Sequence, residues 1–109
     1  MSIADKIKTR VFKQNEIIMR KGEIGNEMYV SIKGKLGVYL ENFDIKKRPA
    51  HIVEEFNVVG EKSLEYSNVP RNATIVCLDP EDTICLEITK QDYKRIINVS
   101  YMIKNVCIL

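Results

Sequence analysis

The stretch Glu27–Leu40, "EMYVSIKGKLGVYL", decides the fold. Apolar residues recur at every second position on both sides of the central glycine: Met28, Val30, Ile32, Leu36, Val38 and Leu40. A period of two is typical of a half-buried β-strand, with Tyr29 and Ser31 on the opposite face of the first segment. Gly34 marks a tight connection between the two segments. The stretch therefore predicts two consecutive strands joined by a sharp turn.

Short extended segments continue outward from this pair of strands. Residues 11–22 divide into two pieces with a turn near Gln14 and Asn15, and residues 50–56 form a further piece. Segments 73–79 and 82–88 are predicted to form a final pair around Asp79 and Pro80. The charged segment 43–50 reads as a loop closed by Pro49. Six to eight short strands at this spacing indicate a mainly β antiparallel sandwich or jelly-roll barrel.

The C-terminal part of the sequence changes from strand to helix character. Thr89, followed three residues later by Asp92, predicts a helix N-cap with an acidic first turn. Tyr93, Ile96 and Ile97 then follow at helical spacing. The apolar residues beyond them are more than one helical face needs. The helix is therefore expected either to continue toward a partner or to break near Asn98 and restart.

Size, charge and cysteine content limit the classes of protein to which this chain can belong. The 109 residues correspond to a single domain 1–109, with 45% hydrophobic and 29% charged residues. The net charge of +2 gives no indication of a nucleic-acid or membrane partner. The first ten residues lack the apolar stretch of a signal peptide. Cys77, Cys85 and Cys107 lack metal-ligand spacing, so we expect free thiols and a cytoplasmic location.

The sequence does not point to an enzyme. His51 is the single histidine, and it lies on a strand-like segment where a surface or packing role is the ordinary one. Glu54 and Glu55 are adjacent, so on a strand they face opposite sides and do not act on one substrate. No serine or cysteine stands in a nucleophile motif such as G-x-S-x-G. We therefore expect no catalytic residues and no bound metal.

The loop "VGEKSLEYSNVPRNAT", residues 59–74, carries the binding signal. Gly60 allows close approach of the backbone, and the residues after it are enough for one helical turn with free N–H groups. Arg71 offers a planar fork of donors for a phosphate, and Glu61 an acceptor for a hydroxyl. These residues fit a ligand with one phosphate and one nearby hydroxyl. A simple Glu61–Arg71 salt bridge that ties down the loop is the alternative.

From about Phe12 to about Tyr93 the chain resembles a cyclic nucleotide-binding domain. The first half of the resemblance is the pattern G-[DE]-x-G-[DN]-x-[ML]-Y, matched at Gly22, Glu23, Gly25, Asn26, Met28 and Tyr29. The second half is the phosphate-binding cassette, matched at Gly60, Glu61, Leu64, Pro70, Arg71, Ala73 and Thr74. The resemblance implies a double-stranded β-helix, or jelly-roll barrel, with a short cassette helix and a C-terminal helix. Gly22, Gly25 and Gly34 are expected to supply turns with positive φ.

The resemblance also implies a role for each cassette residue. Arg71 would pair with the cyclic phosphate, and Glu61 would accept a hydrogen bond from the ribose 2′-hydroxyl. Gly60 would let the sugar lie against the backbone, and the N–H groups of Ser63 and Asn72 would meet the phosphate. The full set of expected ligand-binding residues is Gly60, Glu61, Lys62, Ser63, Arg71, Asn72, Ala73 and Thr74. The ligand would be cGMP or cAMP, with no further cofactor.

Some positions depart from the family pattern. The family often has glycine where Asn15 and Phe56 stand, and the cassette is one residue longer than the commonest form. Asn72 follows the arginine, where the resemblance places alanine in cAMP binders and threonine or serine in cGMP-dependent kinases. Because its amide oxygen can accept a hydrogen bond from a guanine amino group, Asn72 favours cGMP weakly.

Three readings of function follow. The first is a regulatory module that binds a cyclic nucleotide and signals by a C-terminal helix shift to an effector such as a protein kinase. In this reading the chain is part of a larger regulatory protein. The second is a degenerate, non-binding domain of the same fold with an interaction or structural role. The third, an unrelated jelly roll of the cupin kind, lacks the histidines that a cupin metal site requires.

Overall fold

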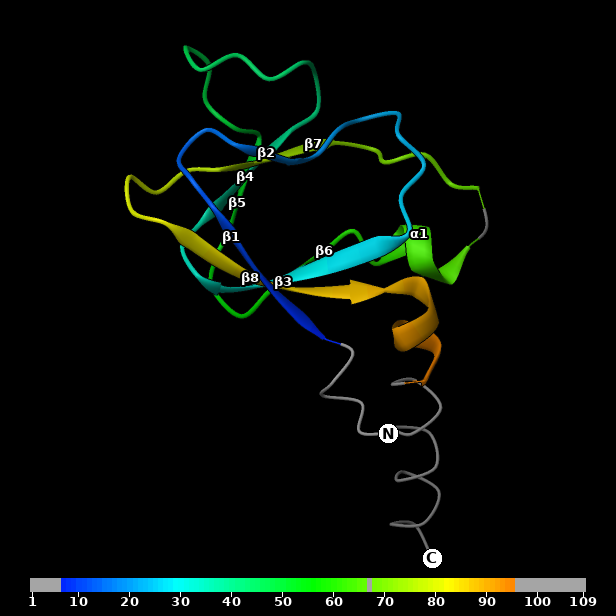
Figure 1. Ribbon diagram of the computed structural model, residues 1–109. Coiled ribbons are helices and arrows are strands. Elements are labelled where there is room, and N and C mark those ends of the chain that lie inside the picture. The colour runs from blue at the N-terminus through cyan, green and yellow to red at the C-terminus, as the bar shows by residue number, and fades with distance from the viewer. Residues whose placement is uncertain (1–6, 67, 96–109) are drawn as a thin grey trace, which may run out of the picture.

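The computed structural model describes residues 7–66 and 68–95, which form a β-barrel of two four-stranded sheets (Figure 1). The first sheet has the order β1 (Lys8–Phe12), β8 (Thr83–Thr89), β3 (Glu27–Lys33) and β6 (Val58–Val59). The second has the order β2 (Ile17–Met19), β7 (Thr74–Cys77), β4 (Leu36–Tyr39) and β5 (His51–Val53). The loop 40–50 projects from the barrel between β4 and β5 (Figure 1).

The strand pairing is that of a jelly roll. β1 pairs with β8, β2 with β7, β3 with β6 and β4 with β5, all antiparallel. The first four strands therefore run alongside the last four in reverse order, and this long ribbon is wound into a barrel. The pairs β3–β8 and β4–β7 join its turns into the two sheets. The mainly β jelly-roll fold expected from the sequence is confirmed.

The expected pairing of segments 73–79 and 82–88 with each other is wrong. β7 and β8 lie in opposite sheets, and the turn around Asp79 and Pro80 carries the chain from one sheet to the other. β7 pairs instead with β2 and β4, and β8 with β1 and β3. Adjacent apolar runs indicate two strands, but the winding of the whole ribbon selects the partners.

Strand β3 is buried on both faces over its first half, rather than on one. Tyr29 and Ser31 lie in the interior, where the Ser31 hydroxyl donates a 2.6 Å hydrogen bond to the Gly34 carbonyl. Met28 is buried on the other face, against Leu64 and Ile88. The hydroxyls of both inward-facing residues have partners, since Tyr29 donates a 3.1 Å hydrogen bond to the Glu87 carboxylate. The barrel therefore holds Tyr29 and Ser31 in its interior, where the alternation predicted apolar residues.

The main core lies between the two sheets. It consists of Phe12, Met19, Tyr29, Leu36, Val59, Ile75, Cys77 and Cys85. Burial raises the pKa of the Cys77 thiol to about 12 and that of Cys85 to about 11. Both thiols are free and stay protonated near neutral pH, so they act as small apolar core residues, as expected. Cys107 lies outside the described residues.

Two turns confirm local expectations. Asn15 has φ of 67° in the predicted turn between β1 and β2, and Gly34 has φ of 98° between β3 and β4. Asparagine tolerates this left-handed conformation better than most residues with a side chain. Phe56 also has a positive φ, 68°, at a position where the resembling family often has glycine.

The helical character after β8 is confirmed as far as the structure extends. Residues 90–95 are helical, and the Thr89 hydroxyl accepts a 3.3 Å hydrogen bond from the Asp92 N–H while donating to its carboxylate at 2.9 Å. The expected break near Asn98 lies outside the described residues. Within residues 7–66 and 68–95, no helix has the length and apolar character needed to cross a membrane.

Candidate functional site

A cavity of about 300 Å³ lies beside the cassette, between α1 (Lys62–Glu65), the segment that follows it and the barrel wall. Seven of the eight expected site residues line it: Gly60, Glu61, Lys62, Ser63, Arg71, Asn72 and Ala73. The barrel side is aliphatic and includes Met19, Val38, Val53, Val58, Val59 and Ile75. One side of the cavity therefore offers charged and polar groups, and the other offers an apolar surface.

Thr74 is the expected site residue that does not line the cavity. It is buried at the start of β7, and its hydroxyl oxygen accepts a 3.0 Å hydrogen bond from the Lys21 N–H. This bond ties the end of the cassette to the segment that precedes Gly22. Thr74 therefore supports the shape of the cassette from outside the cavity.

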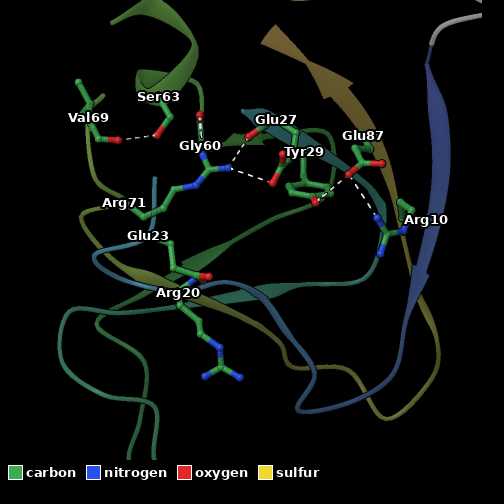
Figure 2. A network of polar contacts seen from close by, with 10 residues as sticks. All are labelled: Arg10, Arg20, Glu23, Glu27, Tyr29, Gly60, Ser63, Val69, Arg71 and Glu87. Atoms are coloured by element: carbon green, nitrogen blue, oxygen red, sulfur yellow. Dashed lines mark hydrogen bonds and ion pairs between the residues drawn. The ribbon is translucent and has the colours of Figure 1, made fainter. Parts of the chain in front are cut away.

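Arg71 is held in place by backbone carbonyls. Its side chain is 3% exposed, and Nη1 donates a 3.1 Å hydrogen bond to the Gly60 carbonyl. Nη2 donates to the Glu27 carbonyl at 2.6 Å and lies 3.4 Å from the Glu27 carboxylate (Figure 2). A guanidinium has five N–H donors, so these bonds leave two without a partner among the described residues.

The glycines around Arg71 make room for its guanidinium. A Cβ on Gly25 would lie 2.0 Å from Nη2, and a Cβ on Gly60 would lie 2.6 Å from Nη1. Gly60 has a positive φ of 86°, and Gly22 has the expected positive φ, 91°, whereas Gly25 does not have a positive φ. The expectation of a turn with positive φ is therefore wrong for Gly25, whose missing side chain makes space for Arg71 instead.

The cassette and the glycine turn before β3 are joined along their backbones. The Arg71 N–H donates to the Glu23 carbonyl at 2.7 Å, and the Gly22 N–H donates to the Arg71 carbonyl at 2.8 Å. Ile24 and Pro70 form an isolated antiparallel bridge beside these bonds. The two halves of the motif read in the sequence are therefore one structural unit.

The other cassette residues surround the short helix. Glu61 stands at the N-cap of α1 with no side-chain capping bond, half-buried at the cavity. Ser63 is buried, and its hydroxyl donates a 3.4 Å hydrogen bond to the Val69 carbonyl across the loop (Figure 2). Lys62 and Asn72 are exposed at the cavity. The Glu61 carboxylate thus remains near the cavity as a hydrogen-bond acceptor.

The alternative of a Glu61–Arg71 salt bridge is wrong, because Arg71 pairs with Glu27 instead. Sequence reasoning missed Glu27 and the role of Gly25. Both lie in the motif "GNEMY", but nothing in its local pattern relates them to Arg71, which follows Glu27 by 44 positions. The aliphatic side of the cavity was also missed, since its residues read only as strand core.

A second apolar cluster connects the cassette to the C-terminal helix. Met28, Leu64 and Ile88 form its buried centre, and Tyr93 packs against it. The Tyr93 hydroxyl donates a 3.2 Å hydrogen bond to the Glu65 carboxylate at the end of α1. Desolvation and this bond raise the pKa of Tyr93. The cassette helix and the helix after β8 are therefore in direct contact.

Taken together, these groups fit a ligand with an anionic group, a hydroxyl and an apolar or planar part. No cluster of three or more His, Cys, Asp or Glu side chains suited to a metal ion occurs in the described part of the chain. The fold and the cavity define a ligand-binding jelly-roll domain.

A model of the cyclic nucleotide-binding domain family matches residues 9–100. The chain belongs to the cyclic nucleotide-binding domain family, and the resemblance noted in its sequence is confirmed.

Curated relatives include subunits and enzymes of cyclic-nucleotide signalling. The chain is 29% identical over 99 residues to a cAMP-dependent protein kinase regulatory subunit of Dictyostelium discoideum, covering 88% of this chain. It is 32% identical over 80 residues to a cGMP-dependent protein kinase of Plasmodium berghei, covering 73% of this chain. The chain spans 29% of the length of the first relative and 8% of the second.

Solved structures show the same fold. The catabolite activator protein of Thermus thermophilus superposes with a TM-score of 0.75 at 22% identity, over 94% of this chain and 47% of that one. A regulatory subunit of a cAMP-independent protein kinase A from Trypanosoma brucei gives a TM-score of 0.72 at 24% identity, over 84% and 31%. The matching family is that of a regulatory binding domain and not of a catalytic one, in agreement with the sequence analysis.

Proposed function

We propose that this domain binds a cyclic nucleotide, cGMP or cAMP, and regulates an attached effector. The observation that carries the proposal is the buried, oriented Arg71 guanidinium at a cavity that Glu61 also lines. Arg71 would meet the cyclic phosphate, and Glu61 would accept a hydrogen bond from the ribose 2′-hydroxyl. The aliphatic side of the cavity would pack on the base.

The other expected contacts follow from the cassette. Gly60 would lie against the sugar, and the backbone N–H groups of Ser63 and Asn72 would reach the phosphate. Lys62 and Ala73 line the same cavity, while Thr74 would act from outside it. These assignments are proposals that rest on the family pattern and on the places of the residues around the cavity.

A non-binding domain of the same fold is the alternative. The Trypanosoma brucei neighbour is named as a subunit of a cAMP-independent kinase, so the fold alone does not decide the ligand. Binding is favoured here because Arg71, Glu61 and an open cavity occur together. A domain relieved of binding has no need to bury an arginine at this position, since moving a cation out of water costs free energy even where a carboxylate lies beside it.

Nucleotide addition is expected to stabilise the folded domain. A ligand that binds only the folded state at a hundred times its Kd contributes about 2.7 kcal/mol. For a domain of this size the melting temperature should rise by roughly 10 °C. The measurement is a melting curve with millimolar cAMP or cGMP, with 5′-AMP and 5′-GMP as matched controls. A melting temperature moved by neither cyclic nucleotide would favour the non-binding alternative.

The same titration addresses nucleotide choice. Asn72 is exposed at the cavity, where its amide oxygen would accept a hydrogen bond from the guanine amino group. One such bond is worth about 1 kcal/mol, or roughly fivefold in affinity. We therefore propose a modest preference for cGMP. A preference for cAMP of about tenfold or more, unchanged in Asn72→Ala, would contradict this role.

A protein kinase is the proposed effector, because two curated relatives are a kinase regulatory subunit and a kinase. The proposed signal is a shift of the helix that begins after Thr89. Its support is the contact of Tyr93 with Glu65 and with the cluster around Leu64. Cytoplasmic location and the lack of nucleic-acid or membrane partners stay predictions, as does membership in a longer regulatory protein.

Amide hydrogen exchange across residues 96–109 should change when nucleotide binds. The reason is that α1 contacts the preceding helix, so a ligand at the cassette would bias where that helix docks. Tyr93→Phe keeps the ring in the cluster but removes the hydroxyl bond to Glu65, and should reduce the ligand-dependent change. Identical exchange with and without nucleotide in the parent protein would show that this coupling is absent.

A further inference from the structure

Arg71 has an anionic partner within the protein itself. Its guanidinium is almost fully buried, and the Glu27 carboxylate lies 3.4 Å from Nη2. No other carboxylate lies within ion-pair distance of Arg71 among the residues that the structure describes. Glu27 is itself one-third exposed, so it reaches from the edge of the site to the buried cation.

We propose that Glu27 is a built-in counter-ion that occupies the charge of Arg71 in the ligand-free state and thereby sets the affinity of the site for an anionic ligand. This inference rests on the proposed function, because the competing anion is the phosphate of the nucleotide. In this proposal Glu27 sets the affinity through its ion pair with Arg71.

Different groups compensate the charge of Arg71 and fix its position. The guanidinium is oriented by the Gly60 carbonyl at 3.1 Å and the Glu27 main-chain carbonyl at 2.6 Å, and neither depends on the Glu27 side chain. Gly25 leaves the space that the guanidinium fills. Neutralising Glu27 therefore removes the counter-charge and leaves the groups that position the Arg71 guanidinium unchanged.

The Glu27 carboxylate and a bound phosphate would each compensate the buried charge of Arg71, so the two anions would compete for it. Without Glu27, the ligand-free state holds an uncompensated buried charge, which destabilises it. A bound phosphate would supply the missing charge, so binding becomes more favourable than in the parent. Because linkage is reciprocal, the free energy by which Glu27 stabilises the ligand-free state is subtracted from the free energy of ligand binding.

The test compares the parent protein with Glu27→Gln, which preserves size and hydrogen bonding. The melting temperature without ligand should fall by about 3–5 °C. Affinity for cAMP and cGMP, measured by calorimetry, should rise by about three- to tenfold. Glu23→Gln is the matched control. Glu23 lies in the turn just before β3, but its carboxylate accepts from the Arg20 N–H and not from Arg71, so neither value should move (Figure 2).

The sign of the affinity change separates the outcomes. A residue that merely supports the pocket would lower both stability and affinity when neutralised. Equal or weaker nucleotide binding by Glu27→Gln, with binding by the parent, would overturn this inference and leave the proposed function standing. Absence of binding by both proteins would overturn the proposed function and this inference together. Binding by Glu27→Gln alone would support a counter-ion strong enough to suppress the site.

Discussion

Replacing Arg71 by alanine is expected to lower affinity for cyclic nucleotide by roughly a hundredfold, which corresponds to about 3 kcal/mol. The guanidinium is the buried cation at the cavity, and hydrogen bonds to the Gly60 and Glu27 carbonyls orient it. A phosphate in a partly closed site without that group would lose its charge-assisted bonds. Calorimetry or competition with a fluorescent cyclic nucleotide measures the loss.

Three further variants sharpen the Arg71 prediction. Arg71→Lys should recover only part of the affinity, because an ammonium does not reproduce the planar fork of donors. Glu61→Gln should weaken binding less, since an amide oxygen still accepts one hydrogen bond. Arg20→Ala is the matched control, because Arg20 is exposed and its side chain points away from Arg71 (Figure 2). Parent-like affinity in a folded Arg71→Ala protein would show that the phosphate site is assigned incorrectly.

Substituting Gly25 by alanine should damage both the fold and the site. The new Cβ would lie 2.0 Å from Nη2 of Arg71, and Cβ atoms in real proteins essentially never come within 3.0 Å of such an atom. The guanidinium must therefore leave its position. Overpacking of this kind costs about 1–3 kcal/mol, or roughly 10 °C in melting temperature. Nucleotide affinity should fall nearly as far as in Arg71→Ala, because the Arg71 guanidinium no longer occupies its position at the cavity.

Gly22→Ala is the matched control for Gly25→Ala. Gly22 lies in the same turn, has φ of 91°, and a Cβ there would meet nothing within 4 Å. Its substitution should therefore cost about 1 kcal/mol of backbone strain and leave the affinity unchanged. If Gly22→Ala and Gly25→Ala lowered affinity equally, the loss would come from the turn as a whole and not from the space that Gly25 leaves for Arg71.

The cassette illustrates how far local sequence predicts a site. Gly60, Glu61 and Arg71 were recognised from residue chemistry and spacing, and the structure brings all three to one cavity. The sequence does not identify the partner of Arg71, because Glu27 lies 44 positions away, at the start of β3 and beside a turn whose glycines are expected to be structural. Chemistry is a property of the residue, but the identity of its neighbours depends on how the chain is wound.

The strands show the same division. Alternation around Gly34, the left-handed turn at Asn15 and the Thr89–Asp92 cap were all determined by the sequence itself. Each depends on side chains and backbone angles within a few residues, where sterics and short hydrogen bonds decide the conformation. These local features were sufficient to predict an antiparallel β domain with a helix after its last strand.

Tertiary structure alone decided which strands are neighbours and which faces are buried. β7 and β8 are adjacent in sequence but lie in opposite sheets, and Tyr29 points into the barrel where it hydrogen-bonds to Glu87 at 3.1 Å. The same winding places Gly25 and Glu27 against Arg71. The physical reason is that strand pairing and burial are set by contacts between distant segments of the chain. These contacts form together when the whole ribbon closes into one core, and no short stretch of sequence specifies them alone.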